Sequence, residues 1–172
     1  AYAAGTTNPF GIARFNGYAG PAFADIDADG DLDLFSGERN GNTLFYRNTA
    51  NPGATAPAYA APTANPFGIS YVGYFTKPPV LADADGDGDL DLYIVDYNGN
   101  RYLRNTGSAN SPAFAAATMY PFGITGAEAR DNIPALADLD GDGDLDLFIG
   151  ERFGNTQVFR NTAAPGATAP AY

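Results

Sequence analysis

The chain has 172 residues, a formal net charge of −11, and neither cysteine nor histidine. These absences exclude a disulfide framework and thiol chemistry, and they remove the commonest general base and transition-metal ligand. The negative charge argues against nucleic acid or an anionic membrane as partner, and no apolar run reaches the roughly 18 residues that membrane insertion requires.

Three copies of one pattern make up the chain, and this internal similarity is its dominant feature. Pro-Phe-Gly-Ile occurs at residues 9–12, 66–69 and 121–124, and Arg-Asn-Thr occurs at residues 47–49, 104–106 and 160–162. We therefore predict one continuous array with repeats at residues 1–57, 58–112 and 113–170, and residues 171–172 opening a fourth repeat.

Each repeat is expected to form four short strands, because Gly and Pro together account for 34 residues and break up long helices. In the first repeat we predict strands near residues 1–4, 21–25, 32–37 and 43–47. The last two should form a hairpin through a turn at Asn40-Gly41. The predicted fold is all-β, with three tandem four-stranded antiparallel propeller-like blades. They would form an open arc that further repeats or other copies complete.

An acidic stretch lies between the second and third predicted strands of every repeat, with aspartate at positions 1, 3, 5, 7 and 9. The fifteen residues are Asp25, Asp27, Asp29, Asp31, Asp33, Asp83, Asp85, Asp87, Asp89, Asp91, Asp138, Asp140, Asp142, Asp144 and Asp146. Glycine at position 6 (Gly30, Gly88 and Gly143) permits a sharp turn that brings the carboxylates together. We predict one Ca2+ per repeat, three in all, because Ca2+ takes six to eight oxygen ligands in flexible geometry. Position 7 would contribute its backbone carbonyl, and position 9 would close the cage.

Other interpretations of these stretches are weaker. An EF-hand requires a glutamate at position 12 and flanking helices, whereas position 12 is Ser36, Ile94 or Ile149 and strands are expected on both sides. Mg2+ demands stricter octahedral geometry, and Zn2+ prefers histidine or cysteine. A solvated acidic turn and a glycosidase carboxylate pair remain alternatives. Catalysis, however, rarely needs three identical sites.

The segments at residues 13–20, 70–78 and 125–132 differ between repeats, and in repeat proteins such loops often carry recognition. Tyr71 and Tyr74 are therefore candidate ligand-binding residues that would stack on a glycan. The alternative is that the aromatic residues of these segments only fill space within the blades.

The end of the chain repeats an internal sequence, since residues 168–172 match residues 55–59. One copy could thus be continued by the start of another, a head-to-tail contact that closes into a ring or extends as a filament. The chain lacks a visible signal peptide and does not begin with Met, so we expect a mature or trimmed piece of a longer product.

The pattern Asp-x-Asp-x-Asp-Gly-Asp-Leu-Asp-Leu, followed by Gly-Asn and Arg-Asn-Thr, resembles FG-GAP or VCBS-type repeats, which are similar to the blades of the integrin α-subunit propeller. This resemblance covers nearly the whole chain. It implies calcium-binding four-stranded blades, with calcium held by the aspartates at positions 1, 3, 5 and 9 and the carbonyl at position 7. It also implies an extracellular or cell-surface location and roles in adhesion or ligand binding. Such propellers usually close with about seven blades, whereas three are present here.

Three functions are compatible with the sequence. The first is a non-enzymatic, calcium-stapled protein of an extracellular fibre, surface layer or adhesin that associates head-to-tail. The second is a glycan-binding module of lectin type, and the third is an accessory domain of a secreted enzyme. The first is favoured because no catalytic set of residues is recognisable.

Overall fold

The computed structural model describes residues 4–17, 20–51, 53–70, 73–74, 77–124, 132–151, 153–164, 167 and 169–172. Within these residues the chain is all-β, with eleven short strands in three antiparallel sheets and a single 3-10 turn, η1 (Pro121–Gly123). The part of the chain described contains no helix of the length and hydropathy needed to cross a bilayer.

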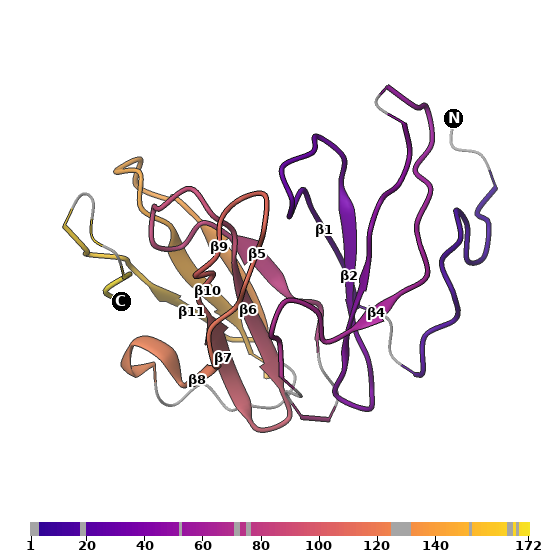
Figure 1. The fold of residues 1–172 in the computed structure, drawn as a ribbon. Helices are drawn as coiled ribbons and strands as arrows, with labels where there is room; N and C mark the ends of the chain where they lie inside the picture. Colours follow the sequence, from indigo (N-terminus) through magenta and orange to yellow (C-terminus); the bar gives the residue numbers. More distant parts are fainter. Residues whose placement is uncertain are drawn as a thin grey trace.

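The sheets follow one another along the chain (Figure 1). The first sheet contains, in order, β1 (Gly20–Ala24), β2 (Asp33–Gly37), β3 (Thr43–Tyr46) and β4 (Thr63–Ala64). The second contains β5 (Val80–Ala82), β6 (Asp91–Asp96), β7 (Gly99–Leu103) and β8 (Thr118–Met119). The third contains β9 (Ile133–Ala137), β10 (Asp146–Gly150) and β11 (Thr156–Phe159).

Three of the four strands predicted in the first repeat are confirmed as β1, β2 and β3, and β2 and β3 form the predicted hairpin. Gly41 has the positive φ expected at the turn, +89°. The predicted strand at residues 1–4 falls mostly on residues outside the described part, and Ala4 is not in a strand.

The outer strands of the first and second sheets, β4 and β8, are a correction to the predicted blade. Around Tyr59 the chain forms only an isolated bridge to Asn48, and the outer strand β4 follows a few residues later. Because β4 lies beyond residue 57, the first sheet takes it from the second predicted repeat; the repeat boundaries themselves remain a prediction. The third sheet has three strands among the described residues.

The second sheet is buried on both faces, and β6 shows why. All six of its residues are buried. Because successive side chains of a strand point to opposite faces, their burial means that both faces are covered. Leu92 and Ile94 pack in a cluster with residues of the first sheet, whereas Tyr93 and Val95 pack in a cluster with residues of the third. The central sheet therefore lies between the other two sheets and packs against both.

Two hydrophobic clusters, each between a pair of sheets, form the core. The first cluster consists of Ile26, Phe35, Phe45, Ile69, Leu92, Ile94, Leu103 and Phe114. The second consists of Ala84, Tyr93, Val95, Tyr102, Ile124, Leu147 and Ile149. Each cluster includes the isoleucine of a Pro-Phe-Gly-Ile motif, so the segments that link the sheets also contribute to the packing between them.

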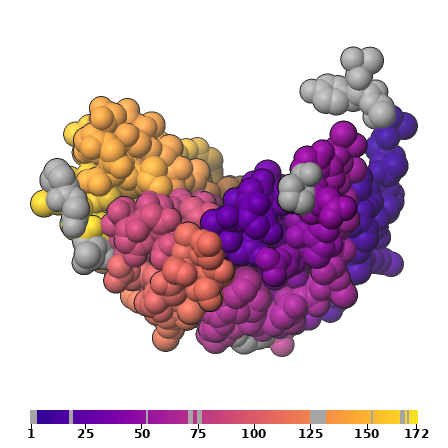
Figure 2. Space-filling model, turned by 45° about the horizontal axis from the view of Figure 1, so that its top comes forward, coloured from indigo at the N-terminus to yellow at the C-terminus, as the bar shows by residue number. Residues whose placement is uncertain are grey.

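The sheets meet at one edge. Strand β5 contacts both β1 and β9, so the first strands of successive sheets lie side by side, and β4 and β8 lie at the opposite edges. The molecule is an open arc in the space-filling view, with the C-terminal residues at one end, the N-terminal residues at the other and a hollow between them (Figure 2). None of the sheets closes on itself.

We predict that Ile94→Ala lowers the free energy of unfolding by about 2–4 kcal/mol, because truncation leaves a cavity between the first and second sheets. Ile94 is fully buried in the first cluster. Urea denaturation followed by circular dichroism measures the change. Met119→Ala, on the exposed outer strand β8, is the control and should change stability by less than about 0.5 kcal/mol. Equal effects of the two substitutions would contradict the packing described here.

Candidate metal centres

The three acidic stretches form equivalent loops, named here the first (residues 25–33), second (83–91) and third (138–146) acidic loops. Each joins the first two strands of its sheet, and position 9 is the first residue of the second strand. The two ends of each loop are held together by strand pairing, since Ala24 pairs with Asp33 and Ala82 pairs with Asp91. Every loop is thus a tight connection across one end of an antiparallel pair.

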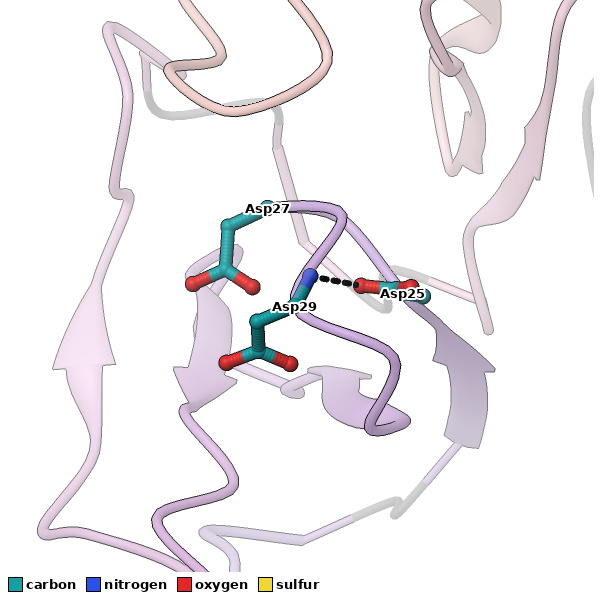
Figure 3. A group of neighbouring side chains, drawn as sticks. All are labelled: Asp25, Asp27 and Asp29. Carbon is teal, nitrogen blue, oxygen red and sulfur yellow. Dashed lines mark hydrogen bonds between the residues drawn. The ribbon is translucent and has the colours of Figure 1, made fainter. Parts of the chain in front are cut away.

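The carboxylates at positions 1, 3 and 5 converge in all three loops. The groups are Asp25, Asp27 and Asp29; Asp83, Asp85 and Asp87; and Asp138, Asp140 and Asp142. In each group, one oxygen from every carboxylate lies within 4.8 Å of the others. Figure 3 shows the first group on the curled loop. Nine of the fifteen predicted aspartates are therefore brought together, three per loop.

Backbone amides hold the curl of each loop. The carboxylate of Asp25 accepts hydrogen bonds from the backbone N–H groups of Asp29 (3.1 Å) and Gly30 (3.0 Å), the first of which is drawn in Figure 3. Asp83 accepts the equivalent bonds from Asp87 and Gly88, both at 3.0 Å. Position 1 thus turns the chain back on itself.

Glycine at position 6 is in the left-handed region in every loop, as predicted, with φ of +93°, +92° and +96° at Gly30, Gly88 and Gly143. A side chain would be strained at these angles. Position 4 also has a positive φ. It is occupied by Gly86 and Gly141 in the later loops, but by Ala28 in the first.

Position 9 makes contacts of its own with the hairpin, and its predicted role as a metal ligand stays a prediction. Asp33, Asp91 and Asp146 are almost fully buried and lie outside the three converging groups. Each accepts a hydrogen bond, at 2.7–2.8 Å, from the backbone N–H of the asparagine in the Arg-Asn-Thr motif. Burial raises the pKa of Asp33 and of Asp91 to about 6, against the lowering effect of these hydrogen bonds. Position 9 therefore anchors the loop to the hairpin.

The motif asparagine extends this anchor to the next segment. Asn48 Oδ1 accepts hydrogen bonds from the backbone N–H groups of Ala50 and Ala58, both at 3.1 Å. Asn105 and Asn161 make the equivalent pairs of bonds. The asparagine thus ties the end of the hairpin to the chain on its way to the next sheet.

The motif arginine is a site residue that the sequence reasoning missed. Arg47 Nη2 lies 2.5 Å from Asp27 Oδ2, and Arg160 Nη2 lies 2.7 Å from Asp140 Oδ2. Arg104 pairs with Asp85 and lies 3.0 Å from Asp87. The regular recurrence of Arg-Asn-Thr after each loop was the signal that could have indicated this role. The arginine offsets part of the charge at position 3.

The residues present suit a hard divalent cation. Four carboxylate oxygens, on Asp27 (Oδ1), Asp33 (Oδ2) and Asp85 (Oδ1 and Oδ2), are buried without a hydrogen-bond partner among the described residues, and of these Asp85 Oδ2 forms the ion pair with Arg104. Burying such groups unpaired is costly. Burial raises the pKa of Asp27 and that of Asp85, the neighbouring carboxylates adding to the effect. A site of carboxylate oxygens without nitrogen or sulfur matches the preference of Ca2+ and not of Zn2+.

The other predicted site residues are less well defined. Position 7 (Asp31, Asp89 and Asp144) is partly exposed, and its backbone N–H donates to the carboxylate at position 5. Tyr71 lies outside the described residues. Tyr74 is 63% exposed, and its carbonyl accepts a hydrogen bond from the backbone N–H of Tyr97. Glycan binding by the two tyrosines stays a prediction.

We predict that Asn105→Ala lowers the free energy of unfolding by about 1–3 kcal/mol, because it removes a buried side chain whose oxygen accepts hydrogen bonds from two backbone N–H groups. Thermal unfolding by calorimetry measures the effect. Asn110→Ala is the matched control, since Asn110 is exposed in the same linker. If both variants have the melting temperature of the wild type, the hydrogen bonds of Asn105 do not contribute to stability.

Comparison with known proteins agrees with this geometry. No curated protein matches the chain significantly. The family model described as FG-GAP-like repeat matches residues 25–94 and 83–149, and each match begins at position 1 of an acidic loop. Together these matches cover well over half of the chain. The resemblance inferred from the motifs is thereby confirmed, and the chain belongs to the FG-GAP-like repeat family.

Proposed function

We propose that this chain is a non-enzymatic calcium-binding repeat protein of an extracellular assembly, such as a fibre, a surface layer or an adhesin. Each repeat holds one Ca2+, three per chain, and the ions act as structural staples. The three sheets act as blades of an open propeller arc, and copies associate head-to-tail. Extracellular placement is supported by family membership, because FG-GAP-like repeats are typical of extracellular proteins and are generally non-catalytic.

One observation carries the calcium proposal: the same three positions converge in all three loops. Like charges so close together repel, and the single arginine at each loop offsets only one of the three charges. A divalent ion supplies the missing positive charge. Three such ions would change the formal net charge from −11 to −5.

The proposed role of the ion is stability, because the loops connect the strands that form the core. An ion that binds only the folded loop stabilises the protein by RT ln(1 + [L]/Kd), which is about 2.7 kcal/mol for each site at a hundredfold excess over Kd. Position 2 of the first loop, Ile26, is buried in the first cluster. A loop fixed by its ion would therefore also fix this contact between sheets.

The propeller arrangement is supported by the contacts of β5 with β1 and β9, which bring the first strands of the sheets together at one edge of the arc. In a propeller the innermost strands lie around a central axis and the outermost strands lie at the rim. The outer positions of β4 and β8 match this pattern.

Calcium titration by calorimetry tests the proposal. Protein stripped with EDTA should bind three Ca2+ per chain, and its melting temperature should rise on binding because the ions offset the repulsion between carboxylates. Asp140→Ala removes position 3 of the third loop and should abolish or weaken one of the three sites. The control is Asp144→Asn, because position 7 is predicted to bind through its backbone carbonyl and should tolerate the change.

Two results would contradict the proposal. Equal melting temperatures with and without chelator would remove the structural role of the ion. Failure of the stripped protein to bind Ca2+ at millimolar concentration, the weak limit for extracellular modules, would remove calcium itself.

A further inference from the structure

Each end of the arc carries an apolar surface whose counterparts are buried or partly buried between the sheets. On the third sheet we define the C-terminal surface as Leu139, Phe148 and Val158. The equivalent residues of the first sheet, Ile26, Phe35 and Phe45, are in the first cluster and face the second sheet. Those of the second sheet, Ala84, Tyr93 and Tyr102, are in the second cluster and face the third. The C-terminal surface would therefore face a fourth sheet.

The exposure of these residues changes sharply at the end of the stack. Leu139 is 59% exposed, whereas its equivalents Ile26 and Ala84 are 2% and 7% exposed. Val158 is 53% exposed, whereas Phe45 and Tyr102 are each 8% exposed. Apolar residues thus occupy positions that no sheet of the described residues covers.

The opposite end shows the complementary change. We define the N-terminal surface as Phe10, Phe23 and Leu32, which are 50%, 55% and 55% exposed. Their equivalents in the second repeat, Phe67, Leu81 and Leu90, pack against the first cluster. In the third repeat, Phe122 and Leu136 pack against the second cluster. The first repeat thus presents the same residues without a preceding sheet.

Two internal ring contacts indicate how the two surfaces would fit together. Inside the molecule, an aromatic residue on the third strand of one sheet contacts the phenylalanine of the Pro-Phe-Gly-Ile motif that precedes the next sheet. Phe45 meets Phe67 and Tyr102 meets Phe122, both with ring centroids 5.0 Å apart. Val158 and Phe10 hold the corresponding positions at the two ends of the chain.

The two surfaces belong to the first repeat and to the third sheet, and the second sheet packs between the first and third sheets. Figure 2 shows the N-terminal and C-terminal residues at opposite ends of the open arc. The two surfaces are different from each other, so a contact between copies would be heterologous and not two-fold symmetric. Apolar surfaces of this kind are typical of protein interfaces.

We propose that the C-terminal surface of one copy packs on the N-terminal surface of a second copy of this chain, with Val158 against Phe10, and so continues the stacking of sheets. This interface rests on the head-to-tail assembly proposed above and assigns residues to it. The contact is of the same kind as the two internal ones, with aliphatic and aromatic side chains on both sides. Tyr46, beneath the N-terminal surface, is already covered by Phe15, with ring centroids 5.8 Å apart. The exposed residues are therefore the outer layer that the second copy would contact.

Two variants and their mixture test the interface by sedimentation velocity over a range of concentrations in saturating Ca2+. Val158→Asp damages only the C-terminal surface. Phe10→Asp damages only the N-terminal surface, and aspartate tolerates the positive φ of +59° at this position. Each variant alone should associate at least roughly tenfold more weakly than the wild type, because a carboxylate would be buried opposite apolar groups. Met119→Asp, on exposed β8 away from both surfaces, is the control and should associate like the wild type.

The mixture gives the decisive result. Val158→Asp retains an intact N-terminal surface and Phe10→Asp retains an intact C-terminal surface, so equal amounts should form a one-to-one dimer that grows no further. Absence of this dimer, or association of each variant as strong as that of the wild type, would overturn the interface.

Calcium binding, measured on the same samples, separates this proposal from the calcium proposal. A wild-type chain that binds three Ca2+ and stays monomeric at all concentrations would overturn the interface and leave the calcium proposal standing. A chain that forms the mixed dimer without binding Ca2+ would do the reverse.

Discussion

The structure depends on a concentration of like charge at three points. Carboxylates at positions 1, 3 and 5 lie within 4.8 Å of one another in every loop, and the backbone brings them there through hydrogen bonds to position 1 and a left-handed glycine at position 6. Such groups repel unless a positive charge lies among them. The arginine of Arg-Asn-Thr supplies one charge from the end of the hairpin. The remaining negative charge is the main support for the proposed cation in each loop.

The acidic loops are coupled to the packing of the sheets by the buried aspartate at position 9. It joins the loop to the motif asparagine, and the asparagine in turn holds the linker to the next sheet. Hydrogen bonds therefore connect each loop to the end of its hairpin and to the following linker. Coupling of this kind between neighbours is typical of repeat proteins, in which each unit is stabilised mainly by the units beside it.

The stacking of the sheets has a direction. The third strands of the first and second sheets each meet the motif phenylalanine of the following repeat, so both internal interfaces have two different sides. The central sheet has a neighbouring sheet on each face, and all residues of β6 are buried. The first and third sheets each have a neighbouring sheet on one face only. This explains why the large exposed apolar residues include Phe10 and Phe23 at one end and Leu139 and Val158 at the other.

Local pattern alone determined the three repeats, the acidic loops, the left-handed glycines and the β2–β3 hairpin, because each depends on residues close together in the chain. Only the tertiary structure decided the rest. It placed Arg47 against Asp27, buried position 9 beneath the loop, and supplied the outer strand β4 from the following repeat. It also made Phe10 exposed and packed Phe67 against the first cluster, although both lie in the same Pro-Phe-Gly-Ile motif. Burial depends on which sheet lies opposite, and a repeated sequence contains the same side chains whether or not that neighbour is present.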